Sequence, residues 1–156
     1  MTPPTANERF SSAAIHLGIE PDIVRFPEDT RTAVQAAAAL GCELGQIIKS
    51  LVFECGGQPI LALTAGDQRV DTASLGVLCG APIGKADAKM VRDATGFAIG
   101  GVPPFGHVDQ LSCWIDQNIL RYEIAWGAAG TPDTVFAIRT EELADLSGGQ
   151  IAQFVN

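Results

Sequence analysis

The stretch Ile47-Ile48-Lys49-Ser50-Leu51-Val52-Phe53 is an apolar run that one lysine and one serine interrupt. It lies within the longer segment Gln46 to Cys55, which Gly56-Gly57 separates from a second apolar segment, Gln58 to Thr64. Two glycines between two apolar segments are typical of a β-hairpin, because a tight hairpin turn needs positive φ angles. We therefore expect these two segments to form antiparallel strands.

Side-chain alternation gives Lys49 an unusual place in the first of these strands. One face would carry Ile47, Lys49, Leu51 and Phe53, and the other Ile48, Ser50 and Val52. A lysine on an apolar face is costly unless its ammonium reaches water or a partner. Either the stem of Lys49 extends to the edge of the sheet, or its ammonium is the cation of a pocket, where burial would lower its pKa and an anionic partner would raise it. Ser50 points away from Lys49, which disfavours a catalytic Ser-Lys pair.

The rest of the chain predicts helices and short strands around this hairpin. The helices expected from capping residues, apolar periodicity and terminal glycines are Thr5 to Leu17, Arg31 to Leu40 capped by Thr30, Asp71 to Cys79, Asp87 to Thr95, and a last helix capped by Thr140. The further strands are Asp22 to Phe26, Phe97 to Ile99, Leu111 to Asp116, and a second hairpin formed by Arg121 to Trp126 and Thr134 to Arg139. Hairpins interspersed with helices indicate an α+β fold.

Composition and charge limit the classes of protein to consider. The 156 residues, of which 47% are hydrophobic, suit one domain that spans 1–156. The net charge of −8 argues against an extended nucleic-acid surface and against anionic membranes, but allows a small local contact with nucleic acid. There is no signal-peptide pattern and no apolar run long enough to span a bilayer. We expect a cytoplasmic protein.

The cysteines do not form a recognisable metal site. Cys42, Cys55, Cys79 and Cys113 are widely spaced, without a CxxC motif or a Cys/His cluster. We therefore expect no metal and no cofactor, and we expect reduced thiols. Cys113 lies in an apolar strand pattern, which disfavours a role as a nucleophile paired with His107.

The second unusual stretch is Gly100-Gly101-Val102-Pro103-Pro104-Phe105-Gly106-His107. Adjacent glycines let a backbone approach a ligand closely, and two prolines stiffen the loop and remove N–H donors. The N–H groups of Gly100, Gly101 and Val102 could form an oxyanion hole or a cradle for ribose or phosphate. The alternative is a rigid turn between two strands. No Gly-Lys-Ser/Thr follows, so the loop is not a P-loop.

Two further residues have open interpretations. His107 follows the glycine-proline loop and is either an acid/base group or a structural histidine. Asp116 ends a predicted strand and is either a carboxylate that supports the site or a cap for a helix from Gln117 onward. No Gly-x-Ser-x-Gly motif is present, so a site here would rely on a positioned cation and backbone donors.

These features together resemble the YbaK/ProX family of aminoacyl-tRNA deacylases, which is related to the editing insertion domain of prolyl-tRNA synthetase. The resemblance extends from about Thr30 to the last helix. Its carriers are Thr30, Ala36-Ala37, Leu40-Gly41, Gln46 to Leu51, Thr95-Gly96, Gly100-Gly101, Pro104, Gly106, Asp116, and the glycine-containing turn from Gly127 to Gly130. The resemblance implies a single α+β domain whose mixed, largely antiparallel, open-barrel-like sheet is flanked by helices.

The resemblance also implies an activity. It points to a trans-editing hydrolase that cleaves the ester between a wrongly attached amino acid and the 3′-terminal adenosine of a tRNA. Lys49 corresponds to the lysine that is the hallmark of the family and would orient the ester and stabilise developing negative charge. The Gly100 to Pro104 loop would contact the aminoacyl-adenosine through its backbone. Gly106, His107, Asp116 and Ser50 are the remaining candidates for substrate contact.

The implied partners follow from this activity. They are the acceptor end of a mischarged tRNA and, because the acidic chain has little basic surface for a whole tRNA, an aminoacyl-tRNA synthetase or an elongation factor. Neither DNA nor a membrane is expected. Family members act on tRNAs that carry alanine, cysteine, serine or threonine, among others. The alternative function is a non-catalytic module that binds an aminoacyl group or a nucleotide as an accessory of a synthetase.

Overall fold

The structure is a computed structural model that describes residues 2–27 and 30–156. Its larger sheet has five strands in the order β4-β2-β3-β5-β8. Their bounds are β2 Ile48–Cys55, β3 Gln58–Ala65, β4 Ile83–Lys85, β5 Ser112–Asp116 and β8 Gln150–Ala152. β2 pairs antiparallel with β3 and β4, whereas β3–β5 and β5–β8 are parallel pairs. The predicted α+β fold with a mixed sheet is therefore confirmed.

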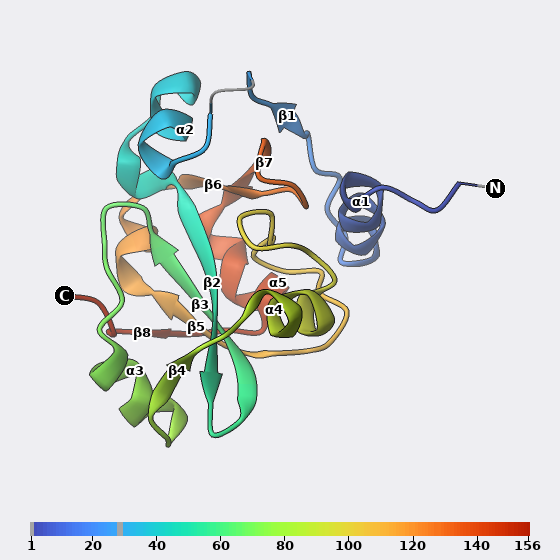
Figure 1. Cartoon of the computed structure of the whole chain (residues 1–156). Helices are drawn as coiled ribbons and strands as arrows, with labels where there is room; N and C mark the ends of the chain where they lie inside the picture. The colour runs from blue at the N-terminus through green and yellow to red at the C-terminus, as the bar shows by residue number, and fades with distance from the viewer. Residues whose placement is uncertain (1, 28–29) are drawn as a thin grey trace.

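A second, smaller sheet consists of antiparallel strands in the order β1-β7-β6. Their bounds are β1 Val24–Arg25, β6 Ile124–Ala128 and β7 Thr134–Arg139. A single parallel bridge between Ile47 and Trp126 joins the start of β2 to β6. The two sheets thus meet where the opening stretch of the sequence enters the larger sheet (Figure 1).

The hairpin predicted from Gln46 to Thr64 is the centre of the larger sheet. Cys55 pairs with Gln58 across the turn, and Gly56 and Gly57 have φ angles of 58° and 83°. Lys49 pairs with Thr64 near the other end. Figure 1 shows β2 and β3 as the long central strands, with α2 near the start of β2 and α3 near the hairpin turn.

Within the described residues, five α-helices and three short 3₁₀ segments surround the sheets. Their bounds are α1 Ala6–His16, α2 Ala33–Leu40, α3 Thr72–Cys79, α4 Ala88–Thr95, α5 Leu143–Ser147, η1 Leu44–Gln46, η2 Gln117–Arg121 and η3 Thr140–Glu142. The Thr5–Glu8 capping box is present, and Asp71 and Asp87 cap α3 and α4. None of the helices in 2–27 and 30–156 is long and apolar enough to cross a membrane.

Aromatic packing in the main core fixes the loop that follows α4. The rings of Phe10, Phe105 and Phe136 pack with centroids 4.7 to 5.7 Å apart, and all three side chains are buried. Phe105 belongs to the glycine-proline loop, Phe10 to α1 and Phe136 to β7. The loop is therefore held between the N-terminal helix and the smaller sheet.

Several predicted boundaries are wrong. Thr32, not Thr30, caps α2, because its hydroxyl accepts from the Gln35 N–H in a capping box. Phe97 to Ile99 is not a strand, since Ala98 begins a turn in which its carbonyl accepts from Gly101. Thr140 opens η3 instead of capping a helix. Its hydroxyl donates to the Tyr122 carbonyl.

The prediction of reduced thiols is wrong for two of the four cysteines. Cys55 and Cys79 form a disulfide, with their Cα atoms 6.7 Å apart. Cys55 ends β2 at the hairpin turn and Cys79 ends α3, so the packing of α3 against this end of the hairpin brings the two sulfurs together. Cys42 and Cys113 are free.

Candidate active site

A pocket of about 430 Å³ lies along one edge of β2. All seven residues from Ile47 to Phe53 line it. On this edge β4 pairs only with Phe53 to Cys55, and Trp126 bridges only Ile47, so Ile48 to Val52 have no strand partner there in the described chain. The pocket occupies this gap. An unpaired strand edge presents backbone N–H and C=O groups to whatever fills it.

The other walls of the pocket come from four parts of the fold. They are the start of α2, the start of α4 with the end of β4, the loop after α4, and the smaller sheet. Their lining residues are Phe26, Thr30, Arg31, Thr32, Ala33, Ala36, Lys85, Ala86, Val91, Ile99, Gly100, Val102, Trp126, Ala128, Pro132, Thr134 and Val135. Most of these side chains are apolar, so the walls suit an uncharged organic group.

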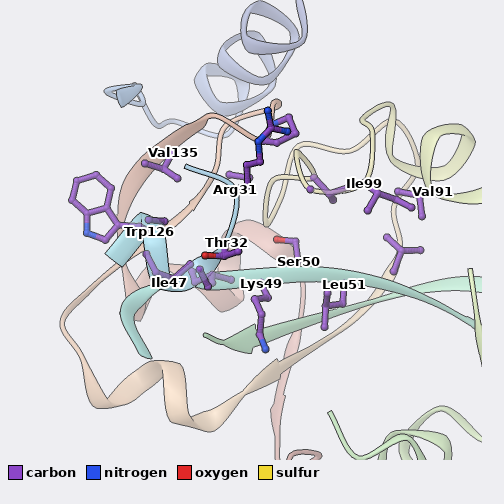
Figure 2. A pocket seen from close by; sticks show the side chains of 18 of the residues that line it. Arg31, Thr32, Ile47, Lys49, Ser50, Leu51, Val91, Ile99, Trp126 and Val135 are labelled. Carbon is purple, nitrogen blue, oxygen red and sulfur yellow. The ribbon is translucent and has the colours of Figure 1, made fainter. Parts of the chain in front are cut away.

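Ser50 supplies a side-chain hydroxyl to this apolar pocket. Its Oγ is buried and has no hydrogen-bond partner in the described chain. Figure 2 shows the side chain pointing from β2 toward the side of the pocket formed by Ile99. A buried hydroxyl without a partner loses the hydrogen bonds it made to water. The Ser50 hydroxyl is therefore ready to bond a polar atom of a ligand.

Lys49 extends from the opposite face of β2. Its Nζ donates to the Gln68 carbonyl oxygen over 2.6 Å, and Figure 2 shows Lys49 and Leu51 pointing away from Ser50. Burial is the main cause that lowers the pKa of Lys49; Arg69 lowers it further, while Asp116 and Asp67 oppose the shift. Lys49 lines the pocket, but its ammonium is not aimed at the loop.

The glycine-proline loop reaches the pocket through only part of its length. Gly100, with φ of 89°, and the buried Val102 line the pocket. The Gly101 N–H instead donates to the Ala98 carbonyl over 2.9 Å. A Cβ on Gly101 would lie 2.8 Å from the Gly130 oxygen, so this glycine allows the loop to pack against the β6–β7 turn.

The predicted convergence of the Lys49 ammonium with three free loop amides is therefore wrong for this structure. The Gly101 amide closes a turn, and the ammonium is held by Gln68. The segments that carry Lys49 and Gly100 nevertheless line the same pocket. The site thus forms between the two stretches that the sequence singled out, but with different atoms facing its interior.

Pro104, Gly106 and His107 support the loop and do not line the pocket. Pro104 is buried against β6, where a Cβ on Gly127 would lie 2.8 Å from its ring. Gly106, with φ of 84°, packs against α1. The Nε2 of His107 lies 2.7 Å from the Pro103 oxygen. Burial lowers the pKa of His107, against a smaller effect of that hydrogen bond. The structural interpretation of His107 fits these contacts.

Asp116 is fully buried and caps η2. One carboxylate oxygen accepts from the Ala65 N–H over 3.0 Å, and the other accepts from the Asn118 N–H over 2.9 Å. The capping interpretation of Asp116 is therefore confirmed. Cys113 is also buried, and burial raises the pKa of its thiol to about 12, which keeps it protonated at neutral pH.

The charged residues that line the pocket are all positive in the part of the chain that the structure describes. Arg31, Lys49 and Lys85 line it, and no described Asp or Glu does. Among those same residues, no group of three or more His, Cys, Asp or Glu side chains could hold a metal ion. Sequence reasoning missed Arg31, Lys85 and Trp126, because no local pattern indicates that these distant segments meet β2.

Comparison with known proteins agrees with this fold. The sequence model of a family described as "Aminoacyl-tRNA editing domain" matches residues 27–146, more than three quarters of the chain. The chain is 30% identical over 133 residues to the uncharacterized protein YwhH of Bacillus subtilis, covering 85% of each. It is 28% identical over 131 residues to a protein of Enterococcus faecalis named "Putative Cys-tRNA(Pro)/Cys-tRNA(Cys) deacylase EbsC", covering 82% of this chain and 79% of that protein.

Solved structures show the same architecture over the whole chain. One, described as a "putative trans-editing enzyme for prolyl tRNA synthetase", has a TM-score of 0.94, 39% identity and 99% coverage of both chains. Another, the hypothetical protein APE2540, has a TM-score of 0.86 and 26% identity, covering 96% of this chain and 100% of its own. The chain therefore belongs to the aminoacyl-tRNA editing domain family, the YbaK/ProX group.

Proposed function

We propose that this protein hydrolyses the ester that joins a wrongly attached amino acid to the 3′-terminal adenosine of a tRNA. One observation carries the proposal: the Ile47 to Phe53 stretch and two residues of the loop, Gly100 and Val102, which sequence reasoning assigned to such a site, line one pocket. Membership of the editing domain family supports it independently. The apolar walls would hold the aminoacyl-adenosine, and the unpaired edge of β2 would provide backbone hydrogen bonds.

Ser50 and Gly100 are the proposed polar contacts to the substrate. The Ser50 hydroxyl has no partner in the described chain, so it can donate to or accept from the ribose or the aminoacyl group without breaking a bond. Gly100 is exposed at the pocket, where a backbone without a Cβ lets the ester approach closely. Pro104, Gly106, His107 and Asp116 would act indirectly, by fixing the loop and the end of β3.

Lys49 is the proposed catalytic residue. A water molecule would attack the ester carbonyl, and the ribose oxygen would leave with the electrons of the broken C–O bond and take up the proton that the attacking water loses. A cation beside the carbonyl lowers this barrier, because negative charge develops on its oxygen. In this proposal the Lys49 ammonium exchanges the Gln68 carbonyl for the substrate, a rotation that its flexible four-carbon stem permits.

A deacylation panel tests this proposal. Single-turnover hydrolysis of tRNAs mischarged with alanine, cysteine, serine or threonine would be measured for the wild type, Lys49→Met and Lys89→Met. Met keeps the apolar stem of Lys49, and Lys89 is an exposed lysine on α4 outside the pocket lining. We expect Lys49→Met to lower the rate by about 10²–10³ and Lys89→Met to leave it unchanged.

The same panel separates the alternatives. If Lys49→Met retains the full rate, Lys49 is not catalytic. If the wild type binds the charged tRNAs but cleaves none faster than the spontaneous rate, the non-catalytic binding module is the correct function. Melting temperatures of all three proteins show whether a lost rate reflects lost folding.

A further inference from the structure

The Lys49 ammonium rests on an uncharged acceptor, although a carboxylate belongs to the very next residue. Its Nζ donates to the backbone carbonyl of Gln68 over 2.6 Å. Burial, followed by Arg69, lowers the pKa of Lys49. The two carboxylates that oppose this shift are Asp116 and Asp67, and Asp67 directly precedes Gln68. No ion pair joins Lys49 to Asp67 in the described chain, so another group must hold the Asp67 carboxylate.

Arg121 is that group. Its Nη2 donates to both carboxylate oxygens of Asp67, over 2.9 and 3.0 Å, and its Nε donates to the Asn118 carbonyl over 2.8 Å. The guanidinium carbon lies 5.1 Å from the centre of the Tyr122 ring, and a Cβ on Gly45 would lie 2.6 Å from Nη2. These contacts surround the guanidinium on several sides and fix it against the Asp67 carboxylate.

The segment η2 holds the turn that carries both acceptors at two points. This turn runs from Ala65 to Gln68, and the Gln68 N–H closes it by donating to the Ala65 carbonyl over 2.9 Å. At the start of η2, the capping residue Asp116 accepts from the Ala65 N–H. At the end of η2, Arg121 binds Asp67. One short segment thus sets where the Gln68 carbonyl and the Asp67 carboxylate lie.

The type of acceptor determines how readily the ammonium leaves it. Transfer from the Gln68 carbonyl to a ligand carbonyl exchanges one neutral acceptor for another. Transfer from a carboxylate would break an ion pair, and partial burial strengthens the attraction between the two charges. An Asp67 carboxylate that Arg121 did not hold would therefore compete with a ligand for Lys49.

We propose that Arg121 is a positioning residue, which keeps the Asp67 carboxylate from capturing the Lys49 ammonium. The ammonium therefore stays on the Gln68 carbonyl, from which it passes to a ligand. That this ligand is an aminoacyl ester rests on the proposed function. Without Arg121, the carboxylate binds the ammonium and holds it away from the pocket. Removing the charge of Asp67 as well then reverses the loss, which a purely structural role of the ion pair would not allow.

Titration of Lys49 tests this proposal without any hydrolysis. The lysines of the chain are Lys49, Lys85 and Lys89, so NMR of protein with carbon-13-labelled lysine resolves few signals, and substitution of each residue assigns them. Arg121→Gln should raise the pKa of Lys49, because it frees a carboxylate for the ammonium. Asp67→Asn should lower this pKa, because it removes a charge that opposes the effect of burial. An unchanged pKa in Asp67→Asn would overturn the proposal, since Asp67 would then be unable to compete for Lys49.

The single-turnover rate of deacylation tests the consequence for the reaction. Arg121→Gln should lower this rate about tenfold, because an ion pair must now be broken. The double variant Asp67→Asn/Arg121→Gln should regain the wild-type rate within about threefold. Arg139→Gln, the matched control, breaks an exposed ion pair outside the pocket lining and should leave the rate unchanged. A folded double variant as slow as Arg121→Gln would overturn the proposal, because the ion pair would then act only through the structure of the turn.

Failure of the proposed function would give a different result. If the wild type cleaves no mischarged tRNA, but Arg121→Gln and Asp67→Asn shift the pKa of Lys49 in opposite directions, the proposed function is refuted and the role of Arg121 stands. If Lys49→Met loses the activity while folded Arg121→Gln keeps the full rate, the proposed function stands and the role of Arg121 is refuted.

Discussion

Ser50 and Thr64 carry buried hydroxyls without a hydrogen-bond partner in the described chain, and they differ in one respect. Ser50 lines the pocket, whereas Thr64 is fully buried in β3 and does not. An unpartnered hydroxyl contributes little to folding, because its removal breaks no hydrogen bond and relieves its desolvation. A side chain of this kind at the base of a pocket is explained by what it offers a ligand.

Replacing each hydroxyl shows whether it contributes to substrate binding or to the stability of the fold. Ser50→Ala should leave the melting temperature unchanged or slightly higher and lower kcat/KM for deacylation by up to about tenfold, the value of one hydrogen bond. Thr64→Val, the matched control, should likewise leave the melting temperature unchanged or slightly higher, but should leave kcat/KM unchanged. A Ser50→Ala protein that melts well below the wild type and keeps its kcat/KM would show that the hydroxyl is structural.

Titration of His107 makes the stability of the folded protein depend on pH, and the direction of this dependence follows from its pKa. Burial lowers its folded pKa below the usual value of 6.5, so between these two values the unfolded chain binds a proton that the folded chain does not. Stability is therefore lost as the pH falls through this window. His107→Gln keeps an N–H donor for the Pro103 oxygen without this titration.

Thermal unfolding at pH 7.5 and pH 5.5 checks this assignment. The loss of melting temperature on acidification should be smaller for His107→Gln than for the wild type. Carboxylates elsewhere in the chain titrate equally in both proteins, so the difference between the two losses isolates His107. Equal losses would mean that His107 is not held neutral in the folded state.

At the scale of elements, the Gly100–His107 loop combines two functions in adjacent glycines. Gly101 packs against the backbone of Gly130 and Thr131 and leaves no room for a Cβ. Gly100 faces the pocket, and a Cβ added to it would lie 3.5 Å from the Pro132 ring, an ordinary contact. Rigid packing at one glycine thus places the other at the ligand. The packing on the buried side of the loop therefore determines where its pocket side lies.

Alanine substitutions distinguish these two glycines. Gly101→Ala should lower the free energy of unfolding by about 2 kcal/mol, because its Cβ meets backbone atoms that cannot move aside. Gly100→Ala should cost only about 1 kcal/mol, from its positive φ, but should reduce substrate binding. Urea unfolding measures both values, and a Gly101→Ala protein as stable as the wild type would contradict this packing.

Local signals account for the elements that the sequence predicted correctly. Gly56-Gly57 indicated the hairpin, and the capping residues Asp71 and Asp87 placed α3 and α4. The cap of α2 was predicted two residues early, although the Thr32–Gln35 spacing was available as a signal. Phe97 to Ile99 was predicted as a strand because a short apolar run does not distinguish a strand from a buried turn.

The site was predictable only in part, for a physical reason. Periodicity placed Lys49 and Ser50 on opposite faces of β2, but it could not identify which face borders the pocket, since that depends on where β4 and β6 end beside β2. Nor could it indicate Gln68, whose carbonyl holds the Lys49 ammonium. Arg31, Lys85 and Trp126 reach the pocket from separate segments through tertiary packing alone.

At the scale of the whole molecule, the pocket is a consequence of how the two sheets meet. β6 touches the start of β2 and β4 touches its end, and the unpaired edge between them is covered by α2 and the loop after α4. The pocket is lined by apolar side chains, by backbone groups of β2 and by three cations, whereas the chain as a whole has a net charge of −8. The proposed activity requires the aminoacyl-adenosine to lie in this gap.

A crystal structure with a non-hydrolysable analogue, 3′-aminoacylamino-3′-deoxyadenosine, tests this claim most directly. We expect the analogue to lie along the edge of β2, in hydrogen-bond contact with the Ser50 hydroxyl and the Gly100 backbone. We also expect the Lys49 ammonium to have moved from the Gln68 carbonyl to the amide carbonyl that replaces the ester. An analogue bound outside this pocket, or bound in it with Lys49 still held by Gln68 and Ser50 still without a partner, would contradict the account.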